Sequence, residues 1–167
     1  MPKNDLIKAT RQLPCSVVIL SAAADGKQGA MTASAMYVSE KPPLVAVSVS
    51  KTFNTYQLID KSKEFVINVI TERQLELAKK IGSSHGKDVD KFHEFNIATE
   101  PAAEIKAPLL ANSFATIECR VRTSVWDVEG NHAIYIAEVV AFKVNEKLEP
   151  LVWFNNGYFK VGTSCHI

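Results

Sequence analysis

Hydroxyl side chains cluster where a short apolar segment of this sequence ends. The apolar run Leu44–Val49 is followed by Ser50 and Lys51, by a turn over residues 52–54, and then by Thr55. A side-chain oxygen at Thr55 is well placed to cap the start of a helix. The first N–H groups of a helix lack backbone partners and carry positive potential, so they favour a bound phosphate. The stretch therefore predicts a place where a flat ligand with a phosphate group is held.

A second segment with unlike faces precedes this one. Met31–Ser39 is predicted to be a strand, and because side chains alternate along a strand, Thr32 and Ser34 share one face. The opposite face carries Met31, Ala33, Ala35 and Tyr37. The small polar face is either a wall that touches a ligand or the solvated side of an ordinary strand.

Length and composition indicate one globular domain over residues 1–167. The chain has 47% apolar and 22% charged residues, which is ordinary for a folded protein. Its 19 Lys and Arg against 18 Asp and Glu give a formal charge of +1, too small to favour nucleic acid or an anionic membrane. The first residues lack the apolar segment of a signal peptide, and no run approaches the roughly 18 apolar residues of a membrane span. We therefore expect a cytoplasmic protein.

The cysteines and histidines predict neither disulfides nor a metal site. Cys15, Cys119 and Cys165 are odd in number and widely spaced, as is typical of reduced thiols. The four histidines have no metal-ligand spacing, and neither CxxC nor HExxH occurs. Any cofactor must be held in another way.

The hydrophobic pattern predicts a mainly antiparallel β-fold of about seven strands. The expected strands are Cys15–Ala24, Met31–Ser39, Leu44–Val49, Glu64–Ile70, Phe114–Val125, His132–Val144, and a hairpin of Val152–Phe154 and Tyr158–Val161. The hairpin turns at Asn155-Asn156-Gly157, where Asn and Gly tolerate positive φ. Few helical segments lie between the strands, which favours a closed or nearly closed barrel over repeated βαβ units.

Only one good helix is expected. Thr71 with Gln74 forms a capping box ahead of an apolar pattern, so Thr71–Ile81 is predicted to be helical and to end at Gly82. The polar segment Ser83–Phe92 is predicted to be a loop, and the chain from there to Pro108 an irregular surface crossing.

Two long strands follow that crossing. Phe114–Val125 is expected to be half-buried, with Ile117, Cys119 and Val121 on the apolar face. Its other face carries Thr116, Glu118, Arg120 and Arg122. His132–Val144 is apolar enough to be covered on much of both faces.

Six short motifs occur in an order that resembles the flavin reductase-like, FMN-binding split-barrel family, over about residues 13–162. They are GAMTAS (Gly29–Ser34), PPLVAVSVSK (Pro42–Lys51), NTYQLI (Asn54–Ile59), EFVINVI (Glu64–Ile70), SSHGKDVDKF (Ser83–Phe92) and EGNHAIYIAEVV (Glu129–Val140). The resemblance implies a mainly β, Greek-key FMN-binding split barrel with one main helix and short helical turns. It also implies a homodimer with one flavin per subunit near the dimer interface.

The resemblance also implies which residues hold FMN. Those beside the ring system, its edge or the ribityl chain would be Met31, Thr32, Ala33, Ser34, Ser48, Val49, Ser50 and Lys51. Those at the phosphate side or completing the site would be Asn54, Thr55, Ser83, Ser84, Lys91 and Phe92, with Tyr158 bordering the flavin. His132 would stand where a nicotinamide approaches, as the candidate catalytic residue. One position departs from the family, because members often carry Asn where this chain has Gly29.

These residue types suit a flavin. Ala33 and Ser34 are small enough for a flat ring to lie against, and hydroxyl groups can pair its polar edge, where a buried unpaired atom costs about 1–3 kcal/mol. The isoalloxazine itself carries hydride and electron chemistry, so the protein contributes position, electrostatics and access. The lack of a catalytic triad is therefore no objection.

Each residue also has a structural interpretation. Thr55 can be a helix cap only, Lys91 a solvated charge and Phe92 a core side chain. Ser48 and Ser50 can simply mark a strand end. A lone histidine such as His132 is commonly structural, and Tyr158 can belong to the core or a dimer contact.

Three functions remain open from the sequence. The first is an FMN-binding oxidoreductase that takes reducing equivalents from NADH or NADPH and passes them to free flavin, ferric iron or a partner protein. The second is a flavoredoxin-like FMN electron carrier that does not itself oxidise a nicotinamide. The third is a barrel without flavin that acts as a binding module.

Overall fold

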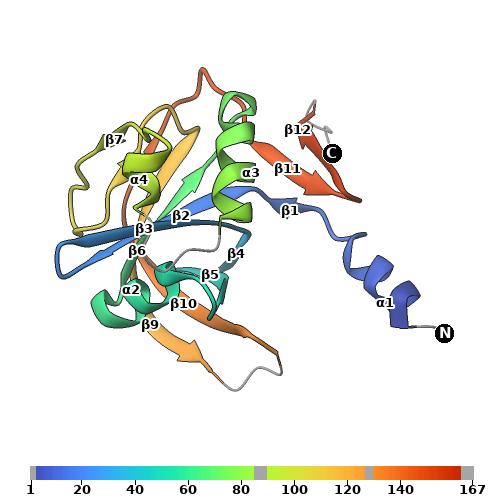
Figure 1. Cartoon of the computed structure of the whole chain (residues 1–167), viewed down its shortest axis with the longest axis horizontal. Helices are drawn as coiled ribbons and strands as arrows, with labels where there is room; N and C mark the ends of the chain where they lie inside the picture. Colours follow the sequence, from blue (N-terminus) through green and yellow to red (C-terminus); the bar gives the residue numbers. More distant parts are fainter. Residues whose placement is uncertain (1–2, 85–89, 127–129, 163–167) are drawn as a thin grey trace.

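The structure, a computed structural model, describes residues 3–84, 90–126 and 130–162. Its largest sheet has seven antiparallel strands in the order β3-β2-β6-β9-β10-β5-β4 (Figure 1). They are β2 (Val18–Ala24), β3 (Lys27–Ala33), β4 (Ala35–Glu40), β5 (Pro43–Ser50), β6 (Glu64–Val69), β9 (Ala115–Val125) and β10 (His132–Val144). The prediction of a mainly β Greek-key barrel is confirmed.

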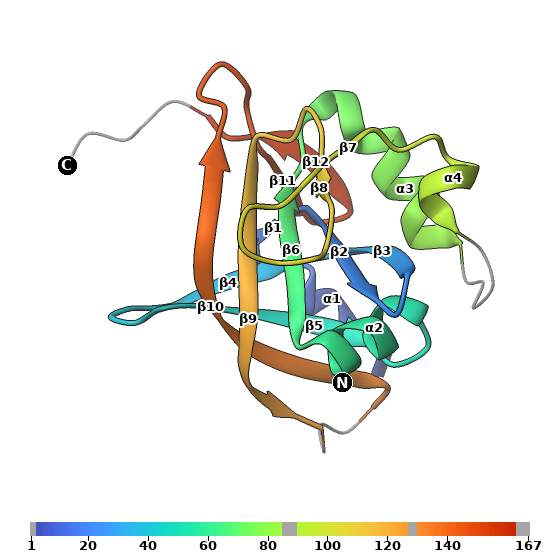
Figure 2. The same cartoon turned by 90° about the vertical axis from the view of Figure 1, so that its left-hand side faces the viewer.

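The barrel is split between its two edge strands. β3 and β4 are the edges of the sheet, yet they follow one another in the chain and only Ser34 separates them (Figure 2). The hydroxyl of Ser16 donates to the carbonyl of Ala35 at 2.8 Å and accepts from its N–H at 3.0 Å, which fixes this corner. The single strand predicted over Met31–Ser39 is therefore wrong, because the chain must turn at Ser34 to pass from one edge to the other. The strand predicted over Cys15–Ala24 is also interrupted, at Val17, between β1 (Cys15–Ser16) and β2.

The barrel interior holds the main core. Alternate side chains of the strands point inward and are buried, among them Leu20, Val47, Phe65 and Tyr135. A second core cluster lies between the sheet and α3 (Leu75–Ser83), and it includes Ile19, Ile81 and Phe92. The sheet thus separates an inner core from a helix-covered outer one.

Helix α2 (Asn54–Ser62) is longer than the helical turn predicted at Thr55. It begins after Phe53, so Thr55 lies inside its first turn and is not the cap. Leu58 and Ile59 pack into the barrel core. Because this helix follows the hydroxyl-rich end of β5, its N-terminus lies beside that strand end.

The helix predicted over Thr71–Ile81 is present with different limits. A short 3-10 turn, η1 (Glu72–Gln74), precedes α3, and the N–H of Thr71 donates to the side chain of Gln74 at 3.3 Å, as a capping box requires. The prediction that Gly82 ends the helix is wrong, since α3 continues through it to Ser83. Gly82 instead provides close packing, because a β-carbon there would lie 3.4 Å from the side chain of Thr32.

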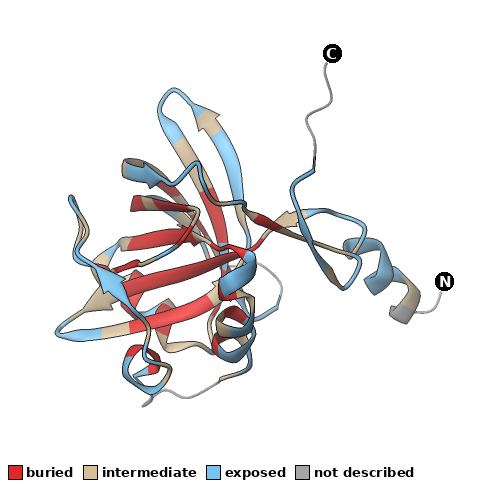
Figure 3. Cartoon of the chain, turned by 90° about the horizontal axis from the view of Figure 1, so that it is seen from above, coloured by how far each residue is buried: buried red, intermediate tan, exposed pale blue. Residues whose placement is uncertain are grey.

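Two elements project from the barrel (Figures 1 and 3). One is α1 (Lys3–Thr10), which the sequence did not predict because its apolar residues Leu6 and Ile7 are exposed and mark no core-facing stripe. The other is the hairpin of β11 (Leu151–Phe154) and β12 (Gly157–Lys160), which joins β1 in a three-stranded sheet. The predicted turn is confirmed, with φ of 45° at Asn155 and 65° at Asn156.

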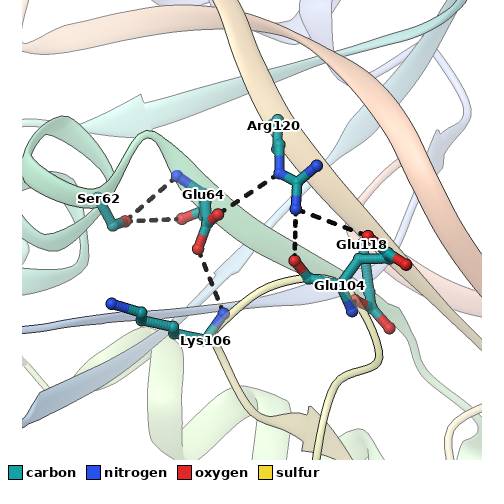
Figure 4. Close-up of polar contacts among 6 residues, drawn as sticks. All are labelled: Ser62, Glu64, Glu104, Lys106, Glu118 and Arg120. Atoms are coloured by element: carbon teal, nitrogen blue, oxygen red, sulfur yellow. Dashed lines mark hydrogen bonds and ion pairs between the residues drawn. The ribbon is translucent and has the colours of Figure 1, made fainter.

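The segment of residues 90–114 covers the outer face of the sheet, mostly as the irregular crossing predicted. It contains α4 (Lys91–Glu94), β7 (Thr99–Glu100) and β8 (Leu109–Leu110). The carboxylate of Glu118 accepts from the N–H groups of Ala103 and Glu104, at 2.9 and 2.8 Å. Arg120 contacts Glu104 and Glu64 around the same crossing (Figure 4). The polar face of β9 is therefore more covered than expected, and Glu118 is only 3% exposed.

None of the helices in the described part of the chain has the length and apolar character needed to cross a membrane.

Candidate functional site

A cavity of about 570 Å³ opens where the edge strands, the end of β5 and the projecting hairpin meet. We call it the strand-end cavity. It is lined by Ser16, Val17, Met31, Thr32, Ala33, Ser34, Ser48, Ser50, Thr52, Phe53, Gly82, Asn131, His132, Trp153 and Tyr158. Eight of these are residues that the sequence singled out for a ligand. The volume lies within the roughly 300–1,000 Å³ typical of small-molecule sites.

Pairing between β5 and β10 builds the polar edge of this cavity. Ser48 and Ser50 lie two residues apart on β5, so they point to the same side of the strand. The register places His132 directly opposite Ser50. Beyond the strand end, the hydroxyl oxygens of Ser50 and Thr52 lie 2.9 Å apart. Three hydroxyl groups and one imidazole therefore border the same opening.

The corner between β3 and β4 forms a wall of small side chains. Ala33 ends β3 and Ser34 follows it, with its side chain exposed to the cavity. The hydroxyl of Thr32 donates to the carbonyl of Ala78 in α3 at 2.5 Å. The hydroxyl proton of Thr32 is thus used in a hydrogen bond within the protein, and the oxygen retains lone pairs that can accept a hydrogen bond from a ligand.

Aromatic side chains form the remaining walls. Trp153 of β11 and Tyr158 of β12 are cross-strand partners in the projecting hairpin, and both line the cavity. Phe53, at the N-cap position of α2, lines it from the other side. Aromatic rings offer flat apolar surface against which a planar ligand can pack.

The N-terminus of α2 adds a site suited to an anion. Its N-cap residue, Phe53, has an extended backbone and no side-chain group that can accept from the helix N–H groups. This nine-residue helix therefore begins, next to the cavity, without a side-chain cap. Unpaired N–H groups and the helix dipole make such an end attractive to a phosphate.

Several predicted site residues do not line the cavity. Val49 points into the barrel and is fully buried in the core. Lys51 turns away, and its ammonium donates to the carbonyl of Trp126 at 2.8 Å. Thr55 is buried in the first turn of α2, facing Gly29. Asn54 follows Phe53 at the start of α2 and is half-buried.

The motif after α3 is also set back from the cavity. Ser83 ends α3 and Ser84 is its C-cap, while only their neighbour Gly82 lines the cavity. Lys91 is 5% exposed and donates to main-chain carbonyls. Phe92 packs in the second core cluster, as its structural interpretation predicted. Residues 85–89 of this predicted loop lie outside the described residues.

Seven lining residues were not assigned to the site from the sequence. They are Ser16, Val17, Thr52, Phe53, Gly82, Asn131 and Trp153. Thr52 and Phe53 lie between two motifs, so a wider window would have found them, and Asn131 lies inside the last motif. Ser16 and Trp153 reach the cavity only because β1 pairs with β11 across the length of the chain, and no local signal predicts that pairing.

Two other cavities lie away from these residues. One of about 640 Å³ is bordered by Asn112, Thr116 and Lys143, and one of about 380 Å³ by Arg73, Gln74 and Asn96. Neither contains a residue that the motifs singled out. The strand-end cavity, although not the larger, is therefore the candidate site.

Comparison with known proteins shows the family of the chain. The sequence profile of the family described as "Flavin reductase like domain" matches residues 10–162. The chain belongs to the flavin reductase-like family. It is 26% identical to an FMN reductase (NADH), RutF 2, of Rhizobium rhizogenes, over 95% of this chain and 89% of that protein. It resembles the flavin reductase PheA2 in structure, with a TM-score of 0.81, 26% identity, and coverage of 98% of this chain and 100% of that one.

A further relative of this flavin reductase-like chain is named as one component of a two-part enzyme. It is the reductase component of a 4-nitrophenol 4-monooxygenase/4-nitrocatechol 2-monooxygenase of Rhodococcus opacus, 33% identical over 74% of this chain. The chain spans 63% of the length of that relative.

The strand-end cavity has the donor set that a flavin requires. Small residues form one wall, aromatic rings form two others, and hydroxyls line the polar edge. The uncapped start of α2 supplies N–H groups for a phosphate. The chain is thus an oxidoreductase of the flavin reductase-like family whose candidate site fits the cofactor of that family.

Proposed function

We propose that this protein oxidises NADH or NADPH and reduces a flavin held in the strand-end cavity. The observation that carries the proposal is the convergence in one cavity of Thr32, Ser34, Ser50 and His132, which come from three separate motifs of the chain. Family membership supports the reaction class, and the lining of the cavity supports the proposed site. We propose a single domain over residues 1–167, and the cytoplasm is the proposed compartment.

The flavin would lie with its ring system between the small residues at Ser34 and the aromatic hairpin. Ser48 and Ser50 would meet its polar edge, because their hydroxyls can both donate and accept. The phosphate of FMN would lie at the start of α2, beside Asn54, where N–H groups are free of a side-chain cap. When bound, the flavin supplies the chemistry of hydride acceptance and electron transfer.

His132 is the proposed residue on the nicotinamide side. It is exposed, begins β10 and stands opposite Ser50 at the mouth of the cavity. Its imidazole can donate a hydrogen bond to an amide or phosphate of an incoming ligand. Its role would be to orient the nicotinamide, since hydride transfer to a flavin needs no acid from the protein.

A partner protein is the proposed acceptor of the reduced flavin. The support is that relatives are named as reductase components of monooxygenases, in Rhodococcus opacus and in Mycobacterium tuberculosis. Such a reductase would deliver reduced flavin to a separate oxygenase. Free flavin and ferric iron are the other acceptors that the same chemistry allows.

A homodimer is proposed on the exposed apolar residues of β4. Met36 is 64% exposed, Tyr37 65% and Val38 38%, all on a strand whose outer edge has no partner within the described residues. Exposed apolar side chains in a row on an edge strand commonly mark a protein interface. β4 begins directly after Ser34, so a second copy there would lie close to the cavity.

Anaerobic mixing with a nicotinamide tests the function. Purified protein loaded with FMN, then mixed with NADH or NADPH without air, should lose flavin absorbance within seconds. Persistence of the band in loaded protein would favour the electron carrier instead. Failure to bind either FMN or FAD in a fluorescence titration would refute both and leave the binding module.

A further inference from the structure

Lys91 is a buried lysine that lies behind the walls of the strand-end cavity without lining it. Lys91 is only 5% exposed, and its ammonium donates to the carbonyls of Ala30 at 3.1 Å and Ile81 at 2.9 Å. The Nζ atom also lies 5.0 Å from the centroid of the Phe53 ring. These three contacts reach β3, α3 and the N-cap position of α2.

Each contacted residue belongs to the cavity wall or adjoins it. Ala30 precedes Met31 in β3, and Ile81 precedes Gly82 in α3, and both of these neighbours line the cavity. Phe53 lines it directly. One ammonium group therefore joins three parts of the wall that lie far apart in the sequence.

The charge of Lys91 has no carboxylate partner within the part of the chain that the structure describes. Burial lowers its pKa to about 8, while the charge of Glu94 acts in the opposite direction. The group is still mostly protonated at neutral pH. A buried cation held only by carbonyl oxygens and an aromatic face is costly, so an anion nearby would stabilise it.

The charge of Lys91 is favourable for the C-terminal end of α3, unfavourable for the N-terminus of α2, and favourable for an anionic ligand. A cation near the last turn of α3 complements the dipole of that helix, because Ile81 lies at its C-terminal end. The same cation lies against the ring of Phe53, the N-cap residue of α2, and a positive charge on this side of α2 has the wrong sign for the dipole at its N-terminus. Placing a positive charge at a helix start adds to the potential that attracts a phosphate.

We propose that Lys91 is a positioning residue of the flavin site, which holds the β3, α2 and α3 walls together and strengthens binding of the ligand's phosphate through its charge, without contacting the ligand. The inference rests on the proposed function, in which the phosphate of a flavin lies at the start of α2. It predicts that the loss of Lys91 acts on the phosphorylated flavin more than on the flavin without phosphate.

The test compares FMN with riboflavin, which has the same ring system and no phosphate. Dissociation constants are measured by quenching of flavin fluorescence in the wild type, in Lys91→Met and in a control, Lys143→Met. Lys143 is an exposed lysine paired with Glu100, remote from this cavity. Lys91→Met should weaken FMN binding roughly tenfold or more, as expected for loss of a unit charge in a partly water-excluded site. Riboflavin should lose several-fold less, and Lys143→Met should change neither.

An unchanged ratio of FMN to riboflavin affinity in Lys91→Met would overturn the inference while leaving the proposed function intact. A wild type that binds neither flavin would instead overturn the proposed function, and the inference with it. If Lys91→Met does not fold, Lys91→Arg decides the matter. It keeps the charge and should keep the preference for FMN, so loss of that preference would count against the proposal.

Discussion

The backbone of Gly29 lies against Thr55, so closely that a β-carbon on Gly29 would stand 3.2 Å from Oγ1 and 3.6 Å from Cα of Thr55. The same atom would be 2.8 Å from Cδ1 of Leu58. β3 and the first turn of α2 therefore touch through a position that has no side chain. A side chain at position 29, such as the asparagine common in the family, would therefore require the side chains of Leu58 and Thr55 to shift.

Gly29→Ala should destabilise the protein and weaken flavin binding together. Overpacking a tight contact costs roughly 1–3 kcal/mol, and relief of the overlap would displace α2, whose N-terminus is the proposed phosphate site, from β3. Urea unfolding and FMN titration measure the two effects. Gly162→Ala is the matched control, because a β-carbon there meets no atom within 4 Å. If Gly29→Ala had the stability of the wild type, β3 and α2 would not be tightly packed at this position.

Ser34→Leu should block the cavity without unfolding the barrel. Ser34 is exposed at the corner between β3 and β4 and lines the cavity, so a larger side chain there occupies ligand space. Steric overlap of this size corresponds to a loss of FMN affinity of roughly tenfold or more. The melting temperature should stay near that of the wild type, as should both properties in Thr123→Leu, an exposed control on β9. Unchanged FMN affinity in Ser34→Leu would place the flavin elsewhere.

His132→Gln should impair the nicotinamide step and spare flavin binding. Loss of a hydrogen bond that orients the nicotinamide should raise its KM about tenfold, while the dissociation constant of FMN stays within about twofold. Stopped-flow reduction at several NADH concentrations separates these quantities. His93→Gln, an exposed histidine on α4 outside the cavity, serves as control. An equal loss of FMN affinity would make His132 a flavin-binding residue instead.

The paired change Met36→Lys and Tyr37→Lys should convert a dimer to monomers. Two charges in an apolar interface on β4 would be buried without partners, which is strongly unfavourable. Light scattering after size-exclusion chromatography gives the mass directly. Phe142→Lys, which alters an exposed aromatic residue of β10, distinguishes the two surfaces. Dissociation by Phe142→Lys alone would move the interface to β10.

The positions of the strands were predicted from the sequence more accurately than the way in which the strands close into a barrel. Alternation located β9 and β10 to within a residue or two, because β10 alternates buried and half-buried positions from Ala133 to Ala137 and β9 buries Cys119 on its apolar face. The break at Ser34 was missed, since it depends on Ser16 and Ala35 meeting across the split. Eight of the residues that the family motifs singled out line the cavity, whereas Val49, Thr55 and Lys91 are buried and do not line it. A motif marks both kinds of residue alike, and only the fold separates them.

The pH dependence of stability offers an independent test of the burial of Lys91. Burial lowers its pKa from the usual 10.5 to about 8 in the folded chain, and Glu94 partly opposes this shift. Below about pH 8 the group is protonated in both the folded and unfolded states, so the full cost of burying the charge is present. Between about pH 8 and 10.5 the unfolded chain binds more protons, and stability therefore rises with pH by at most about 3 kcal/mol. Urea unfolding of flavin-free wild type and Lys91→Met is measured at pH 7.5, 9 and 10. The free energy of unfolding of the wild type should rise relative to that of the variant as the pH increases. Parallel pH profiles for the two proteins would show that this ammonium is solvated, and that Lys91 does not bear on the wall of the cavity.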